Sequence, residues 1–186
     1  MSSGPWTAER RYEEPRAHAV RERYLGIFGG EELPVPVEAI AEDLLGLRVE
    51  ERWDVDVSGM LLPAERRIVL NAAEAPRDEA PLRRFRFTIA HEVGHWVCHC
   101  LEGRAPDLEP SYCRPVDLTE AADRALEREA NVFAAELLMP EPAVREAWEE
   151  LGDIAACAAR FDVSPTAMQW RLYGYGLCEC PQAGAG

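Results

Sequence analysis

The chain has 186 residues, 47% of them hydrophobic, with 34 acidic against 20 basic side chains and a net charge of −14. This length and apolar content fit one folded domain, alone or with a small appendage, and exclude a disordered chain. The acidic excess would repel a phosphate backbone, so it argues against nucleic acid as the main partner and favours a neutral or basic protein.

The N-terminal part is expected to contain two helices joined by an extended stretch. The first helix is amphipathic, starts late because of Pro15, and stops at Gly29-Gly30. Residues 33–36 include two prolines and are expected to be extended. Apolar residues then recur at helical spacing and predict a short helix over about 37–45.

Three apolar segments follow at 47–50, 57–62 and 67–71, and each resembles a short strand. The turn at 63–66 makes the last two a hairpin, so we expect a small antiparallel sheet over 47–71. The strand around Ile68-Val69-Leu70 would be an edge to which an extended peptide could add through backbone hydrogen bonds.

Helices are expected to dominate the rest of the chain. One runs over about 82–100, and a second over 120–139 is ended by Pro140. Three shorter helices are predicted over about 141–151, 152–161 and 164–173.

The predicted helix at 82–100 contains the run His91-Glu92-Val93-Gly94-His95. Positions i and i+4 lie on one face of a helix, so the imidazoles of His91 and His95 can bind one Zn²⁺ together. Glu92 then lies beside the metal rather than on it, as the general base does in the H-E-x-x-H arrangement of zinc peptidases. The alternative is an accidental match within an ordinary amphipathic helix. With only four histidines in the chain, we do not expect this spacing by chance.

A catalytic zinc usually has three protein ligands and one open position. The predicted helix at 120–139 offers two candidates for the third ligand, Glu127 and Glu129. Glu127 falls at the edge of the apolar face of this helix, in line with Asn131, whereas Glu129 points towards solvent. This geometry favours Glu127 over Glu129, and Asn131 could hydrogen-bond a ligating histidine.

Together these motifs resemble the ImmA/IrrE family of zinc metallopeptidases. The resemblance covers about residues 33–173, and two specific runs carry it: Arg86 to His95, and Glu127-x-Glu129-Ala130-Asn131-x-Phe133-Ala134-x-x-Leu137-Leu138-Met139-Pro140. It implies that His91 and His95 are zinc ligands, Glu92 is the catalytic base and Glu127 is the third ligand.

The resemblance also implies a function. Family members are typically cytoplasmic and often encoded with a helix-turn-helix transcription repressor, whose cleavage induces mobile-element or stress-response genes. The chain is thus expected to be a zinc-dependent metalloendopeptidase that cuts such a repressor. An alternative is a zinc-binding module that holds a transcription regulator without cutting it, although a pure binder would have no need of Glu92.

The expected fold class is α+β, organised in three parts. Residues 1–30 form an N-terminal tail and helix, residues 31–140 a zincin-like peptidase core, and residues 141–186 a C-terminal helical segment. Within the last part, 154–172 resembles a helix-turn-helix with Ser164 as an N-cap. Its second helix has one Arg and no Lys, so a helix pair packed on the peptidase is favoured over a DNA reader.

The chain has six cysteines, at positions 98, 100, 113, 157, 178 and 180. We see neither a secretory signal pattern nor an apolar stretch long enough to span a bilayer, so we expect a cytoplasmic protein with reduced thiols. Cys98, Cys100, Cys113, Cys178 and Cys180 could hold a second zinc, but C-x-C spacing is not typical of zinc sites and free thiols are the default. For an extra oxyanion donor, Tyr112 and His99 are candidates only because they lie near the motif in sequence.

Overall fold

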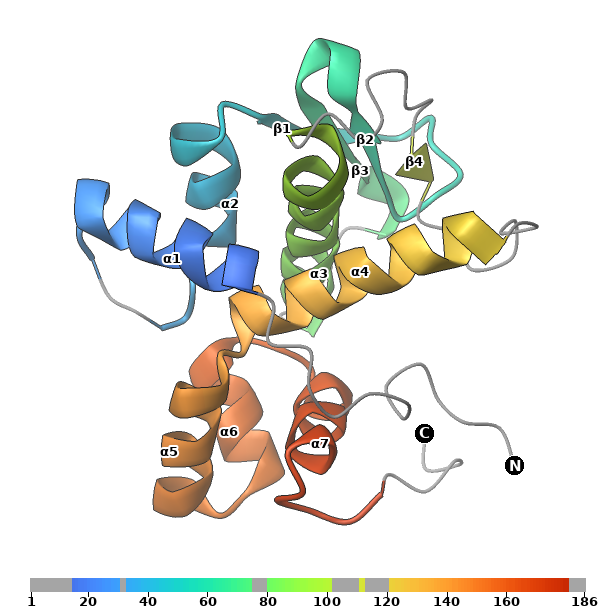
Figure 1. Cartoon of the computed structure of the whole chain (residues 1–186). Helices are drawn as coiled ribbons and strands as arrows, with labels where there is room; N and C mark the ends of the chain where they lie inside the picture. The colour runs from blue at the N-terminus through green and yellow to red at the C-terminus, as the bar shows by residue number, and fades with distance from the viewer. Residues whose placement is uncertain (1–14, 31–32, 75–79, 102–110, 113–120, 181–186) are drawn as a thin grey trace.

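The computed structural model describes residues 15–30, 33–74, 80–101, 111–112 and 121–180. These residues form helices and one small sheet, which confirms the α+β fold class (Figure 1). The helices are α1 (Pro15–Phe28), α2 (Val37–Ala39), α3 (Ala80–His95), α4 (Ala121–Leu138), α5 (Glu141–Leu151), α6 (Ile154–Phe161) and α7 (Pro165–Gly174). The strands are β1 (Arg48–Arg52), β2 (Gly59–Leu62), β3 (Arg67–Asn71) and β4 (Ser111–Tyr112).

The sheet is mixed, not antiparallel as predicted. Its strand order is β1-β3-β2-β4, with β3 antiparallel to β2 but parallel to β1. The predicted hairpin is present, because the turn at Pro63–Glu65 joins β2 directly to β3. The strand around Ile68 is therefore central and not an edge, so the prediction that a peptide adds there is wrong. β3 has four consecutive buried residues, whereas β1 is largely exposed, and the more apolar strand takes the inner position.

Helix α3 occupies the centre of the molecule. It contacts β2, β3 and α2, and it packs most extensively against α4. Every residue from Thr88 to His99 is buried, so this stretch has no solvent-facing side. The helix continues beyond His95 as a π-helical turn, Trp96–Cys100, in which Leu101 N–H bonds the carbonyl of Trp96 at 3.0 Å.

Helix α4 lies across the molecule between two groups of elements (Figure 1). On one side are α3, the sheet, α1 and α2, and on the other are α5, α6 and α7. Its C-terminal end contributes Leu137 and Leu138, both fully buried, to a hydrophobic core that continues through Phe161 and Leu172 of the C-terminal helices. The segment after Pro140 is thus packed onto the rest of the chain by apolar contacts.

Local signals explain where the C-terminal helices start and stop. Pro140 ends α4, and Gly152 ends α5 in a left-handed conformation with φ of 59°. Asp153 caps α6 by accepting a hydrogen bond from Ala156 N–H, and Ser164 caps α7, as predicted. Among the described residues, no helix is both long and apolar enough to cross a membrane.

The second helix of the helix-turn-helix-like segment directs its basic side chain inwards. Arg171 of α7 forms an ion pair with Glu136 of α4 and donates a hydrogen bond to the carbonyl of Met139 at 2.9 Å. Its guanidinium also lies 4.6 Å from the centre of the Tyr175 ring. Because Arg171 is the only basic residue of α7, this helix keeps no basic side chain for a phosphate backbone.

Candidate metal centre

The buried stretch that runs from α3 into the π-helical turn after it carries several polar side chains. Thr88, His91, Glu92, His95 and His99 are each no more than 8% exposed. Burying ionisable groups in a protein interior is unfavourable unless they are paired or bind a cation. The cluster is therefore better explained by a binding or catalytic role than by stability.

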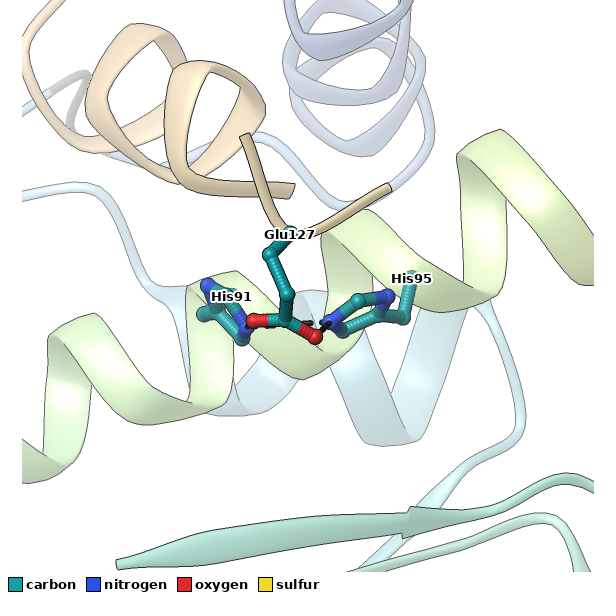
Figure 2. A group of neighbouring side chains, drawn as sticks. All are labelled: His91, His95 and Glu127. Atoms are coloured by element: carbon teal, nitrogen blue, oxygen red, sulfur yellow. Dashed lines mark hydrogen bonds and ion pairs between the residues drawn. The ribbon is translucent and has the colours of Figure 1, made fainter. Parts of the chain in front are cut away.

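His91 and His95 lie one turn apart on α3 and face the same point (Figure 2). Their Nε2 atoms are 3.0 Å apart, and the two rings meet nearly edge to face. Helical geometry produces this arrangement, because side chains four residues apart project from one face of the helix.

Glu127 reaches the same point from α4 (Figure 2). One carboxylate oxygen lies 3.2 Å from Nε2 of His91, and the other lies 3.1 Å from Nε2 of His95. Within the described part of the chain, these three residues are the only group of three or more potential ligands, with ligand atoms all within 4.8 Å of one another. Two imidazole nitrogens and one carboxylate are a donor set that suits Zn²⁺ and leaves a fourth position open.

Gly94 allows α4 to approach α3 closely enough for this contact. A Cβ atom at Gly94 would lie 3.0 Å from the carbonyl oxygen of Ala130, 3.1 Å from its Cα and 3.2 Å from the ring of Phe133. These distances are shorter than ordinary van der Waals contacts. Ala130 is one helical turn beyond Glu127, so the absence of a side chain at 94 helps to set the distance of the carboxylate from the histidines.

Opposite charges at the site shift the ionisation of its members. Burial opposes the charged form of Glu127, but hydrogen bonds from His91 and His95 outweigh it and lower the pKa of this carboxyl to about 2. Burial likewise opposes protonation of His91, but its hydrogen bond to Glu127 and the nearby Glu92 carboxylate raise its pKa overall. The site therefore favours positive charge beside Glu127, as a cation site must.

Asn131 fixes the orientation of the His91 ring. Its Oδ1 lies 3.1 Å from Nδ1 of His91, so Nδ1 carries a proton and donates it to the amide oxygen. The opposite nitrogen, Nε2, faces Glu127. A cation at Nε2 would replace the proton there without disturbing the bond to Asn131, so the residues fit a bound metal.

Glu92 follows His91 and has no solvent exposure. It is close to β2, because a Cβ atom built on Gly59 would lie 3.6 Å from the Oε1 of Glu92 and would overlap Cγ2 of Thr88. A side chain at position 59 would thus clash with α3. The glycine lets β2 run directly alongside the helix at the residue predicted to be the base.

Glu129, the other candidate ligand, points away from the two histidines that share Glu127. Its side chain is 42% exposed, and its carboxylate lies 3.2 Å from Nε2 of His99. The contact made by the other side of that ring, where Nδ1 of His99 lies 3.2 Å from Nδ1 of His95, was not predicted from the sequence. The spacing of His91, His95 and His99 at successive i+4 positions was the signal that could have revealed it. Because His99 contacts the Nδ1 side of His95, it is not placed as an oxyanion donor.

Among the residues that the structure describes, the cysteines form no comparable group. Cys98 and Cys157 are buried, Cys100 and Cys178 are partly buried, and Cys180 is exposed, while Cys113 lies outside the described residues. Burial raises the pKa of the thiols of Cys100 and Cys178, which favours their protonated form. None of the described cysteines joins a group of three or more potential metal ligands. Tyr112 pairs with Met60 of β2 through the backbone of β4.

Comparison with known proteins places this geometry in context. Residues 49–173 match a peptidase family described as the IrrE N-terminal-like domain. The chain is also 31% identical over 118 residues to the radiation response metalloprotease IrrE of Deinococcus radiodurans, a match that covers 61% of this chain and 33% of that protein. The chain thus corresponds to about one third of the length of this curated relative.

A solved structure shares the fold. It is described as a Mycobacterium tuberculosis transcriptional regulator, and it superposes with a TM-score of 0.61 over 88% of this chain and 48% of the other. The two sequences are 18% identical, so the likeness concerns the fold alone.

Proposed function

Because the chain belongs to the family of IrrE N-terminal-like peptidase domains, we propose that it is a zinc-dependent metalloendopeptidase. The observation that carries the proposal is the convergence of His91, His95 and Glu127, whose ligand atoms lie within 4.8 Å of one another. The 31% identity to a protein named as a metalloprotease supports the same activity.

In this proposal His91, His95 and Glu127 hold the zinc, and Asn131 orients His91. Zinc in such a site lowers the pKa of a bound water and polarises the scissile carbonyl. Glu92 acts as the general base, accepting a proton from the attacking water and passing it to the leaving amine. The low pKa of Glu127 keeps its carboxylate ionised at neutral pH, ready to act as a ligand.

We propose a transcription repressor of the helix-turn-helix type as the substrate, cut to induce mobile-element or stress-response genes. The family resemblance in the sequence motifs supports this class, and so does the net charge of −14, since DNA-binding repressors carry basic surfaces. The proposed setting is the cytoplasm, where such repressors act.

The first test measures zinc per chain in purified protein. Wild type should bind one zinc, Glu127→Ala should lose it, and Glu129→Ala should retain it when zinc is in excess. Retention by Glu127→Ala together with loss by Glu129→Ala would reassign the third ligand. An exposed acid on α5, Glu149, provides the control substitution Glu149→Ala, which should change nothing.

The second test separates metal binding from catalysis. Glu92→Gln should bind zinc as wild type does and should abolish cleavage of co-expressed repressors. A variant that still cuts would show that Glu92 is not the base.

One observation favours a second candidate function, the non-cleaving module that holds a regulator. Glu92 is fully buried, so in this conformation it has no access to solvent. Capture of a repressor that stays full-length during prolonged incubation with the zinc-loaded protein would support the module and oppose the peptidase.

A further inference from the structure

His99 is a buried imidazole that the proposed chemistry does not use. It is 1% exposed and lies one turn beyond His95, within the π-helical turn Trp96–Cys100. Its two nitrogens have different neighbours: Nδ1 faces Nδ1 of His95, and Nε2 faces Oε2 of Glu129, each at 3.2 Å. Glu129 in turn lies 3.9 Å from Arg16 of α1. The structure therefore connects His95 to the surface through one ring and one carboxylate.

When Nε2 of His95 binds a metal, the hydrogen bonds from His95 to His99 and from His99 to Glu129 can run in only one direction. The ligating Nε2 must present its lone pair, so the proton of His95 lies on Nδ1 and can only be donated to Nδ1 of His99. The proton of His99 then lies on Nε2 and is donated to Glu129, a carboxylate that only accepts. Each donor meets an acceptor, and reversing either bond would leave two donors or two acceptors in contact.

We propose that His99 and Glu129 are positioning residues that fix the tautomer and the ring orientation of His95 so that its Nε2 faces the metal. The inference rests on the proposed function, because it assigns a role relative to the same zinc. His91 and His95 are then held differently: Asn131 anchors the first from α4, and a histidine on the same helix anchors the second. The carboxylate of Glu129, which accepts the hydrogen bond from His99, is partly exposed to solvent.

The proposal predicts how zinc affinity responds to substitution. In His99→Leu the bond to His95 is lost, and the affinity measured by competition with a chelator should fall by about 10- to 100-fold, as for other partners of ligating histidines. His99→Asn should recover most of the loss, because its amide oxygen can accept from His95 near the place of the ring nitrogen. Glu129→Ala should lower the zinc affinity by less, because Glu129 contacts His95 only through the ring of His99.

A matched control and a spectroscopic readout separate positioning from general damage. His18 is exposed on α1 and is the only histidine outside this cluster, so His18→Leu should leave the zinc affinity unchanged. In zinc-loaded wild type, ¹⁵N–¹H spectra of the side chains should show a proton on Nδ1 of both His95 and His91. In His99→Leu the His95 signal alone should shift or broaden.

Three results would overturn the positioning role while leaving the peptidase proposal intact. They are wild-type zinc affinity in His99→Leu, an unaltered His95 signal in that variant, and no recovery in His99→Asn. If His99→Leu does not fold, Glu129→Ala decides, and unchanged affinity there would refute the role. A wild-type protein that binds no zinc would instead refute the proposed function itself.

Discussion

Gly94 offers the sharpest test of how the two ligand-bearing helices are held together. Gly94→Ala places a methyl group 3.0–3.2 Å from the backbone of Ala130 and the ring of Phe133, so α4 must retreat by a few tenths of an ångström. Overpacking of this kind costs about 1–3 kcal/mol. The better helix propensity of alanine returns about 0.5–1 kcal/mol. We therefore expect a net destabilisation of up to about 2.5 kcal/mol.

The same shift should weaken zinc binding. Glu127 lies one turn from Ala130, and metal sites tolerate only about 0.2 Å in ligand distance. Urea unfolding of chelator-treated protein followed by circular dichroism gives the packing effect, and chelator competition gives the zinc affinity.

Gly26 provides a matched control on α1, where nothing lies within 4 Å of an added Cβ. Gly26→Ala should stabilise the protein by about 0.5–1 kcal/mol without changing zinc affinity. If Gly94→Ala were as stable as Gly26→Ala and bound zinc as wild type does, the close crossing at Gly94 would not position Glu127.

Further predictions concern charge and partner choice. In metal-free protein Glu127 has its pKa lowered from 4.5 to about 2, so its contribution is full above pH 5 and is lost as the pH falls towards 2. The stability advantage of wild type over Glu127→Gln, measured by urea unfolding across this range, should therefore decline by about 3 kcal/mol in total, and a constant difference would contradict the pairing. Arg171→Leu leaves the Glu136 carboxylate, 14% exposed, without its cationic partner and should destabilise by about 3 kcal/mol, whereas Arg160→Leu, which breaks a more exposed pair, should cost less than about 1 kcal/mol; equal losses would refute the distinction. In gel-shift assays the protein should not retard duplex DNA at any salt concentration, because Arg171 is engaged internally.

The elements predicted most accurately are those whose ends are marked by residues close by in the sequence. The bounds of α5 follow from Pro140 and Gly152, and the bounds of β3 follow from the charged and polar residues around its apolar run. The H-E-x-x-H spacing placed His91 and His95 on one face because helical periodicity alone decides that geometry.

The prediction failed where the outcome depends on contacts between distant segments. Alternating residues identify a strand but do not say which neighbour it pairs with, so the central place of β3 and its parallel pairing with β1 were missed. Glu129 was predicted from helical periodicity to face solvent, and it is partly exposed. Its bond to His99 was not predicted, because that bond depends on the angle at which α3 and α4 cross.

Helix α4 lies between α3 and the C-terminal helices, and this arrangement has a consequence for how the protein unfolds locally. Leu137 and Leu138 at its C-terminal end belong to the same hydrophobic core as Phe161 and Leu172 of the C-terminal helices, while Ala130 and Phe133 lie beside Gly94 of α3. Releasing α5–α7 would therefore uncover the supporting surface of the helix that carries Glu127. Amide hydrogen exchange in the centre of α3 and in α6 should then report a single cooperative opening with one free energy, rather than two independent units.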